Sequence, residues 1–90
     1  DFTANAFSPN GDGINETFKI EDNHILSLNI EIYNRWGNLV FTSQERDFEW
    51  DGTNQSSGQD CPQGNYIYRY ELVSFDGTFV KDQKSIVLLR

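Results

Sequence analysis

The chain has 90 residues, with seven basic and fourteen acidic side chains and a formal net charge of −7. A chain of this length builds one hydrophobic core rather than two. The acidic balance repels phosphate backbones and anionic lipid surfaces, so nucleic acid is excluded as a partner. No apolar run is long enough to cross a bilayer, and we expect no stable membrane insertion.

A loop between two short predicted strands is the first feature along the chain. Residues 2–7 and 17–20 show a strand pattern, and residues 7–16 between them are dense in Gly, Asn, Asp and side-chain oxygens. Such a composition suits neither a strand nor a helix, so we expect a specialised loop. Residues 21–27 are predicted to form a further loop or a single turn.

Three side chains of the first loop place oxygen ligands close together. Asn10, Asp12 and Glu16 stand at i, i+2 and i+6, with glycines that let the backbone fold around one point. In one interpretation they bind calcium, and a carboxylate from elsewhere in the chain, such as Asp51, completes the site. In the other, the side chains bond to their own backbone and the loop is a tight corner. A true EF-hand is excluded, because its twelfth position falls on Lys19.

Alternating apolar and polar residues predict a hairpin in the middle of the chain. Residues 28–34 and 39–42 are each predicted as a strand, with Gly37 in the turn between them. Arg35 and Trp36 then stand near the tip. Either they form a recognition site for stacking, carboxylate or carbohydrate contacts, or Trp36 folds over the sheet edge while Arg35 pairs with an acid.

The segment that follows is rich in turn residues. We expect Trp50 to close one end of the core and Asp51 to cap a turn that Gly52 permits. Residues 53–63 form the longest stretch without a regular pattern and contain Cys61, the single cysteine. One cysteine excludes an internal disulfide, and we interpret it as an incidental thiol, with a cross-link to another chain as the alternative.

A second hairpin is predicted near the end of the chain. Residues 66–75 place tyrosines on one face, which is expected to join the core, and Asp76 with Gly77 turns the chain into the last strand. Short strands with turns between them predict an all-β fold, an antiparallel immunoglobulin-like β-sandwich of about seven short strands. The predicted core residues are aromatic: Phe7, Phe18, Phe41, Trp50, Tyr66 and Tyr68.

The chain closes with an apolar run: Ile86, Val87, Leu88, Leu89 and Arg90. In one interpretation this strand lies at a sheet edge, where a receptor adds a strand to its free backbone groups. In the other, it completes the core and Arg90 is solvated.

Nothing in the sequence indicates a catalytic site. His24 is the only histidine and Cys61 the only thiol, and neither lies in a nucleophile turn or a metal-ligand pair. His24 is interpreted as a solvated loop residue. We therefore expect no enzyme.

Five motifs in order resemble one known family. They are FSPNGDGIN at 7–15, IYNRWG at 32–37, WDGT at 50–53, GNYIY at 64–68 and IVLLR at 86–90. Together they resemble the gliding motility-associated C-terminal domain, the type B sorting domain of the type IX secretion system. Two places depart from the family pattern: Glu16 stands where Asp is usual, and Lys84-Ser85 where a glycine is general.

The resemblance implies a non-enzymatic sorting domain over residues 1–90. The lack of methionine fits a domain excised from a larger secreted or surface protein. The expected partners are outer-membrane translocon and shuttle components, and the expected destination is the cell surface or the medium, reached through the periplasm. We expect a monomer, recognised through Arg35, Trp36, Ile86, Val87, Leu88, Leu89 and Arg90. The alternative is an extracellular carbohydrate-binding or adhesion module of immunoglobulin-like fold that uses Trp36 and the calcium-like loop.

Overall fold

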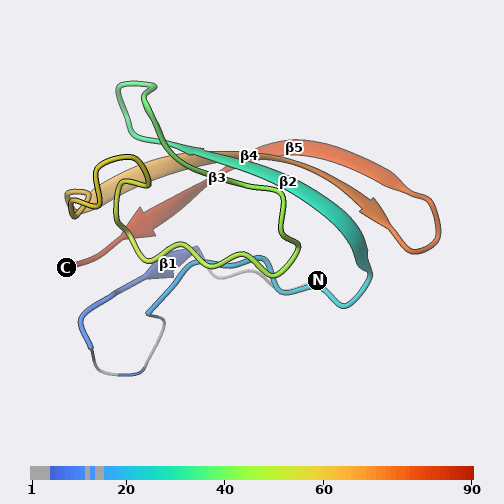
Figure 1. Ribbon diagram of the computed structural model, residues 1–90, viewed down its shortest axis with the longest axis horizontal. Coiled ribbons are helices and arrows are strands. Elements are labelled where there is room, and N and C mark those ends of the chain that lie inside the picture. Colours follow the sequence, from blue (N-terminus) through green and yellow to red (C-terminus); the bar gives the residue numbers. More distant parts are fainter. Residues whose placement is uncertain (1–4, 12, 14–15) are drawn as a thin grey trace.

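The computed structural model describes residues 5–11, 13 and 16–90 (Figure 1). The strands are β1 (Ala6–Phe7), β2 (Ile25–Tyr33), β3 (Leu39–Ser43), β4 (Gly64–Ser74) and β5 (Phe79–Leu88). They form one five-stranded sheet in the order β1-β5-β4-β2-β3. The described residues contain no helix, and hence none that is long and apolar enough to cross a membrane.

The sheet is mixed rather than purely antiparallel. The pairs β2–β3, β2–β4 and β4–β5 are antiparallel, whereas β1 runs parallel to β5 through Ala6 opposite Val87 and Phe7 opposite Leu88. The all-β class is confirmed. The antiparallel sandwich of about seven strands is not, because the strands of the described residues belong to a single open sheet.

An irregular layer covers one face of this sheet. Figure 1 shows the segments that precede β2 and follow β3 lying across that face together with β1. Within the layer Phe18 and Trp50 form one isolated antiparallel bridge, with backbone N to O distances of 2.8 and 2.9 Å. The strand predicted at 17–20 is therefore reduced to a bridge at Phe18.

The core lies between the sheet and the irregular layer. The aromatic rings meet in pairs there: the ring centroids of Phe7 and Trp50 are 5.3 Å apart, and those of Phe18 and Tyr68 are 4.7 Å apart. All six predicted core residues contact this core, and of these only Phe41 is half-buried rather than buried. The sheet adds aliphatic residues to this core: Ile25, Leu28, Ile30, Ile32, Val40, Leu72, Ile86 and Leu88. Burial of Ile86 and Leu88 agrees with the interpretation in which the terminal run completes the core.

The predicted β4–β5 hairpin is confirmed. Gly77 has a φ of 87°, a conformation that glycine adopts without strain. Ser74 N–H donates to the Thr78 carbonyl at 2.8 Å, and Asp76 Oδ1 accepts from Thr78 N–H at 3.0 Å. The turn therefore fixes the register of the two longest strands.

The outer edge of β3 is closed by one residue of the following loop. Gln55 accepts from Thr42 N–H at 3.1 Å and donates to the Thr42 carbonyl at 2.9 Å through its side chain. Its own N–H donates to the Val40 carbonyl at 2.8 Å. Gln55 thus replaces the next strand at this edge, which reduces unwanted strand pairing.

Candidate recognition surface

The tip of the β2–β3 hairpin is held in one conformation by an asparagine. Asn34 Oδ1 accepts from the N–H groups of Trp36 and Asn38 at 3.0 and 2.9 Å. Gly37, with a φ of 83°, closes the turn, and its N–H donates to the Asn34 carbonyl at 3.0 Å. Trp36 is therefore presented from a rigid turn rather than from a loose loop.

The Arg35 and Trp36 side chains at this tip contact one another. The Trp36 side chain is 66% exposed, and the Arg35 guanidinium carbon lies 4.4 Å from the Trp36 ring centroid. This distance is within cation–π range. Trp36 is largely exposed, so a large apolar ring is available for contact. Its role in recognition stays a prediction.

A hollow lies between this tip and the loop that leads into β4. Its walls come from both segments: Asn34, Arg35, Trp36, Pro62, Gln63, Gly64, Asn65 and Tyr66. Tyr66 Oη donates to the Pro62 carbonyl at 2.5 Å, which ties the loop to the start of β4. Burial raises the pKa of the Tyr66 hydroxyl, so it acts there as a neutral donor.

Arg90 binds both the loop that leads into β4 and the turn at Gly52. Its Nε donates to the Cys61 carbonyl and its Nη2 to the Gly52 carbonyl, both at 2.8 Å. Its backbone N–H donates to Gln63 Oε1 at 3.0 Å. Arg90 is exposed, as one interpretation expected, yet its planar guanidinium spans the Cys61 and Gly52 carbonyls, the second of which also accepts from Cys61 N–H at 2.8 Å.

The turn that accepts Arg90 is built as the sequence predicted. Asp51 Oδ1 accepts from the N–H and the hydroxyl of Thr53 at 3.1 and 2.7 Å. Trp50 is 1% exposed, and its indole N–H donates to the Thr53 carbonyl at 2.9 Å. Gly52, with a φ of 85°, lies directly under the end of the chain.

The terminal strand is not a free edge. Ile86 and Leu88 are fully buried. Val87 N–H donates to the Asn5 carbonyl at 3.0 Å, and Leu89 N–H donates to the Phe7 carbonyl at 2.9 Å. Strand addition by a receptor at this end of β5 would first have to displace β1.

Cys61 is a core residue and not an incidental loop thiol. Its side chain is 4% exposed, and burial raises the pKa of the thiol. A neutral, covered thiol is a weak nucleophile, so neither a cross-link nor catalysis is favoured at this position. Sequence reasoning missed it because its neighbours in the chain are polar.

The predicted recognition residues form two sets, one at the β2–β3 tip and one at the end of the chain, and both lie at one end of the molecule. Figure 1 shows the β2–β3 tip, the loop before β4 and the C-terminal end of the chain on the same side of the domain. Residues 61–66 connect the sets, because Cys61 and Gln63 hold Arg90 while Pro62 and Tyr66 line the hollow beside Trp36. We call this combination of tip, loop and Arg90 the recognition end.

The ordered motifs also place the chain in a family. A family model described as the CHU_C type IX secretion signal domain matches residues 2–89. The chain belongs to this family. The resemblance drawn from the five motifs is thereby confirmed, whereas no curated protein sequence matched the chain. A domain of this family has a sorting role and is a targeting module rather than a catalytic one. This role implies that the secretion machinery recognises the domain and that a passenger is exported.

The loop of the signal domain that suggested calcium is only partly described. Glu16 accepts from the N–H of Gly11 and of Gly13, one with each carboxylate oxygen, so both oxygens bond to backbone. Asp12 lies outside the described residues, and Asn10 N–H donates to the Ser8 carbonyl at 2.9 Å. The residues that the structure describes hold no group of three His, Cys, Asp or Glu side chains that could bind a metal ion. Calcium binding stays a prediction, which a calcium-dependent melting temperature would support.

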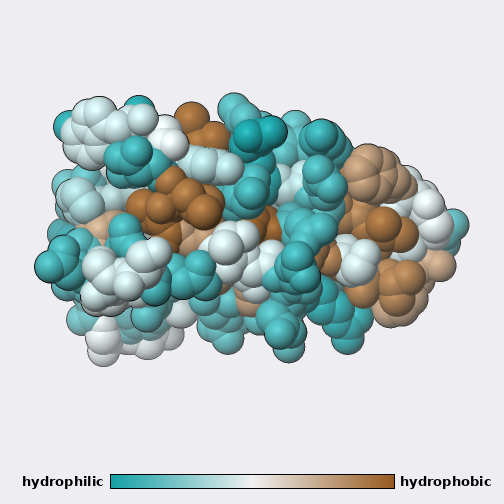
Figure 2. All heavy atoms as spheres, turned by 45° about the horizontal axis from the view of Figure 1, so that its top comes forward, coloured by the Kyte–Doolittle hydropathy of each residue, from teal (hydrophilic) through white to brown (hydrophobic). Residues whose placement is uncertain are grey.

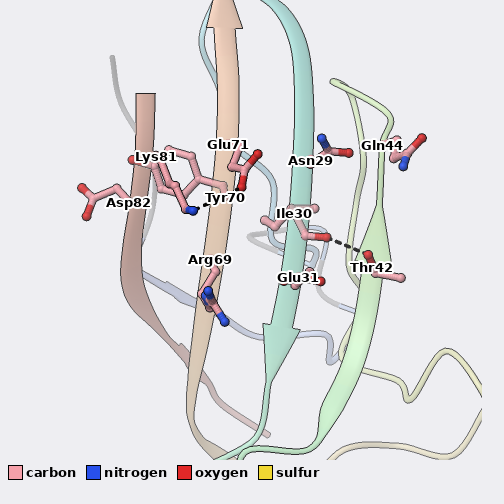
Figure 3. Close-up of a pocket in the computed structure, with 10 residues that line it drawn as sticks. All are labelled: Asn29, Ile30, Glu31, Thr42, Gln44, Arg69, Tyr70, Glu71, Lys81 and Asp82. Atoms are coloured by element: carbon pink, nitrogen blue, oxygen red, sulfur yellow. Dashed lines mark hydrogen bonds and ion pairs between the residues drawn. The ribbon is translucent and has the colours of Figure 1, made fainter. Parts of the chain in front are cut away.

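The uncovered face of the sheet carries a polar hollow (Figure 3), lined by Asn29, Ile30, Glu31, Thr42, Gln44, Arg69, Tyr70, Glu71, Lys81 and Asp82. The charges alternate in sign across the strands, and Lys81 Nζ lies 3.7 Å from Glu71 Oε2 with both side chains exposed. Exposed pairs of this kind contribute little energy. Figure 2 shows hydrophilic side chains across the middle of the molecule, with apolar groups left of the middle and at the right-hand end.

Proposed function

We propose that this domain directs a passenger, carried in the same polypeptide, across the outer membrane by type IX secretion to the cell surface or the medium. Outer-membrane translocon and shuttle components are the proposed partners. The observation that carries the proposal is the family match over residues 2–89. The recognition end adds a physical means by which such partners would bind.

Trp36 is the proposed anchor of that contact. A large aromatic ring on a rigid turn buries much area on binding and loses little conformational entropy. Arg35, stacked on the ring, adds a cation beside it. Exposed aromatic and arginine side chains of this kind supply most of the energy at many protein interfaces.

The terminal residues have divided roles in this proposal. Ile86 and Leu88 hold the fold from within the core, whereas Leu89 is 44% exposed. Arg90 keeps the loop of the recognition end in position through its bonds to Cys61 and Gln63. The secretion machinery therefore recognises a folded surface. Loss of the terminal residues removes core packing and also changes the shape of that surface.

The domain is proposed to act as a monomer. Gln55 closes the β3 edge, as described above. Two copies would each carry a net charge of −7, which opposes association at low ionic strength.

The test is secretion of a fluorescent protein that carries residues 1–90 at its C-terminus, with an upstream export signal. We expect it outside type IX-competent cells and in the periplasm of a translocon-deficient mutant. Trp36→Ala is expected to abolish the difference, while Phe75→Ala is the matched control, because Phe75 is similarly exposed at 61%. Equal retention of the unmodified fusion in both strains would contradict the proposal.

A carbohydrate-binding or adhesion module is the second candidate, favoured by the amide side chains of Gln63 and Asn65 beside the exposed Trp36. Stacking of a sugar on an aromatic ring with amides nearby is chemically reasonable. A glycan array with the intact domain and with Trp36→Ala separates the two functions. Binding that is lost in the variant would favour the module, and an empty array would count against it.

A further inference from the structure

The hollow between the β2–β3 tip and the loop before β4 is lined by hydrogen-bond donors and by no carboxylate. Its walls include Arg35 and the amide side chains of Asn34, Gln63 and Asn65, but neither Asp nor Glu, although the chain has fourteen acidic residues. A guanidinium has five N–H donors and no acceptor. Arg35 stacks on Trp36 through its flat face, with 4.4 Å from its central carbon to the ring centroid, which leaves the N–H groups of its edge for a ligand.

Two of the amide side chains in this hollow have oxygens that already accept hydrogen bonds from the backbone. Asn34 Oδ1 accepts from both Trp36 N–H and Asn38 N–H, which uses its two lone pairs. Gln63 Oε1 accepts from Arg90 N–H at 3.0 Å. Asn34 therefore offers a ligand only its NH₂ group, and the NH₂ group of Gln63 is the end that remains. Both groups are donors, so the hollow favours a ligand with strong acceptors.

The charges near the hollow point to an anionic acceptor. Among the residues that the structure describes, the ion pairs lie elsewhere and none involves Arg35 or Arg90. Arg90 donates to neutral carbonyls, so its charge is not cancelled by those bonds. Burial raises the pKa of the Tyr66 hydroxyl, and the charges of Arg90 and Arg35 act against that rise, so both guanidinium groups lie near this wall of the hollow. The hollow is thus a positive site in a chain of net charge −7.

We propose that this hollow binds the carboxylate of an Asp or Glu side chain on the secretion-machinery protein that contacts Trp36. The inference rests on the proposed function and gives the chemistry of that contact. The hollow has a volume of about 70 Å³, which is room for a few waters or for the end of one side chain. Arg35 would donate two parallel N–H bonds to the carboxylate, and the NH₂ groups of Asn34 and Gln63 would donate to the same oxygens.

Asn34→Asp is the decisive variant. Aspartate keeps the oxygen that caps the turn and replaces the NH₂ donor by a charged acceptor, which repels a carboxylate. Asn54→Asp is the matched control, because Asn54 Oδ1 also accepts from two backbone N–H groups, those of Ser56 and Ser57. Asn54 lines a separate hollow at Trp36 that already contains Asp60.

Both variants are placed in the fluorescent fusion, and their melting temperatures are measured on the purified chain. We expect Asn34→Asp to lower export by about tenfold or more and Asn54→Asp to stay within about twofold of the unmodified fusion. The melting temperatures of both variants should match that of the unmodified chain, because each keeps its cap.

Arg35 is tested by its charge and by its shape. Arg35→Glu reverses the charge, and Lys19→Glu makes a reversal of the same size at an exposed position outside the hollow. We expect Arg35→Glu to lower export by about tenfold or more, with Lys19→Glu within about twofold. Arg35→Lys should give an intermediate loss, because lysine keeps the charge but lacks the planar fork that binds both carboxylate oxygens.

A binding measurement tests the hollow without the partner and without export. Acetate is the probe, and chloride at the same ionic strength is the reference. The side-chain NH₂ resonances of Asn34 and Gln63 are followed by NMR in the purified chain. We expect shifts that saturate with acetate and not with chloride, and we expect them to be lost in Arg35→Glu.

The outcomes separate this proposal from the function on which it rests. Export of folded Asn34→Asp and of folded Arg35→Glu at the unmodified level would overturn the carboxylate site and leave the sorting function intact. Acetate shifts no larger than those with chloride would also overturn it. An unmodified fusion that is not exported would refute the sorting function, whereas saturable acetate binding in the same chain would keep the carboxylate site.

Two further results would assign the effects differently. A fall in export that is equal in Asn34→Asp and Asn54→Asp would place the effect outside this hollow and overturn the assignment. Binding of an acidic glycan that is lost in Asn34→Asp, with export unchanged, would assign the hollow to a sugar carboxylate and overturn the protein partner.

Discussion

Gly52 and Arg90, which lie 38 residues apart in the chain, fit together so closely that a side chain at position 52 would press on its neighbours. A β-carbon there would lie 3.1 Å from Arg90 Nη2 and 3.2 Å from Leu88 Cδ1. The turn after Trp50 and the end of the chain are therefore one structural unit, although the sequence presents them as separate motifs.

Replacing Gly52 by alanine is expected to destabilise the fold. The positive φ costs about 1 kcal/mol for an alanine, and the contacts with Arg90 and Leu88 add about 1–3 kcal/mol. Gly58→Ala is the matched control, because Gly58 has a φ of 75° and nothing within 4 Å of its added β-carbon. Urea unfolding of both variants gives the comparison. Equal losses would show that the backbone alone requires glycine at position 52.

Cys61 is expected to report on the Arg90 contact through its reactivity. Burial raises the pKa of the thiol, so this group stabilises the fold below the pKa of the unfolded thiol, and the contribution is lost as the pH rises through the folded pKa. At pH 8 we expect alkylation by iodoacetamide to be about 100-fold slower than in urea.

Arg90→Ala removes the hydrogen bond to the Cys61 carbonyl and the one to the Gly52 carbonyl. We expect alkylation of Cys61 to be about tenfold faster in this variant, because local opening becomes easier. Arg35→Ala, which removes a guanidinium stacked on Trp36, is the control and is expected to leave the rate unchanged. An unchanged rate in Arg90→Ala would mean that the thiol is protected by the core alone.

The two tryptophans are expected to separate stability from function. Trp50 is 1% exposed and Trp36 is 66% exposed. Trp50→Ala should lower the free energy of unfolding by about 3–5 kcal/mol, and Trp36→Ala by no more than about 0.5 kcal/mol. Thermal unfolding tests the stabilities, and export of the fluorescent fusion tests function. A large loss of stability in Trp36→Ala would assign the residue to the fold.

Acid is expected to loosen the β4–β5 hairpin. The hydrogen bond from Thr78 N–H holds the pKa of Asp76 below its ordinary value, so the stabilisation is present above the unfolded pKa and is lost as the pH falls through the folded pKa, below roughly pH 4. The Thr78 amide resonance, followed by NMR, should show this titration, and Asp76→Asn should abolish it.

Asp22 provides the internal reference for this experiment. Its pKa is also lowered, first by the hydrogen bond from His24 N–H, at 2.8 Å. The His24 amide should therefore titrate alike in the unmodified chain and in Asp76→Asn. A Thr78 titration that persists in the variant would point to another acid.

Sequence reasoning found the hairpins because their signals are local. The asparagine and glycine at the β2–β3 tip and the Asp76-Gly77 pair specify turns through their own backbone preferences and side-chain caps. The face of β4 that carries Tyr66 and Tyr68 followed from a period of two, which any half-buried strand shows. His24 was interpreted as solvated, and the structure leaves it exposed beside Asp22.

What the sequence by itself determined was therefore the all-β class, the turns, the aromatic core and the family, because each depends on neighbours in the chain or on ordered motifs. Only the tertiary structure decided that β1 pairs parallel with β5, that Cys61 is buried and that Arg90 reaches Gly52. These are contacts between residues far apart in the chain, and no local pattern records them. They also close the terminal end of β5, because β1 pairs with it at Val87 and Leu88.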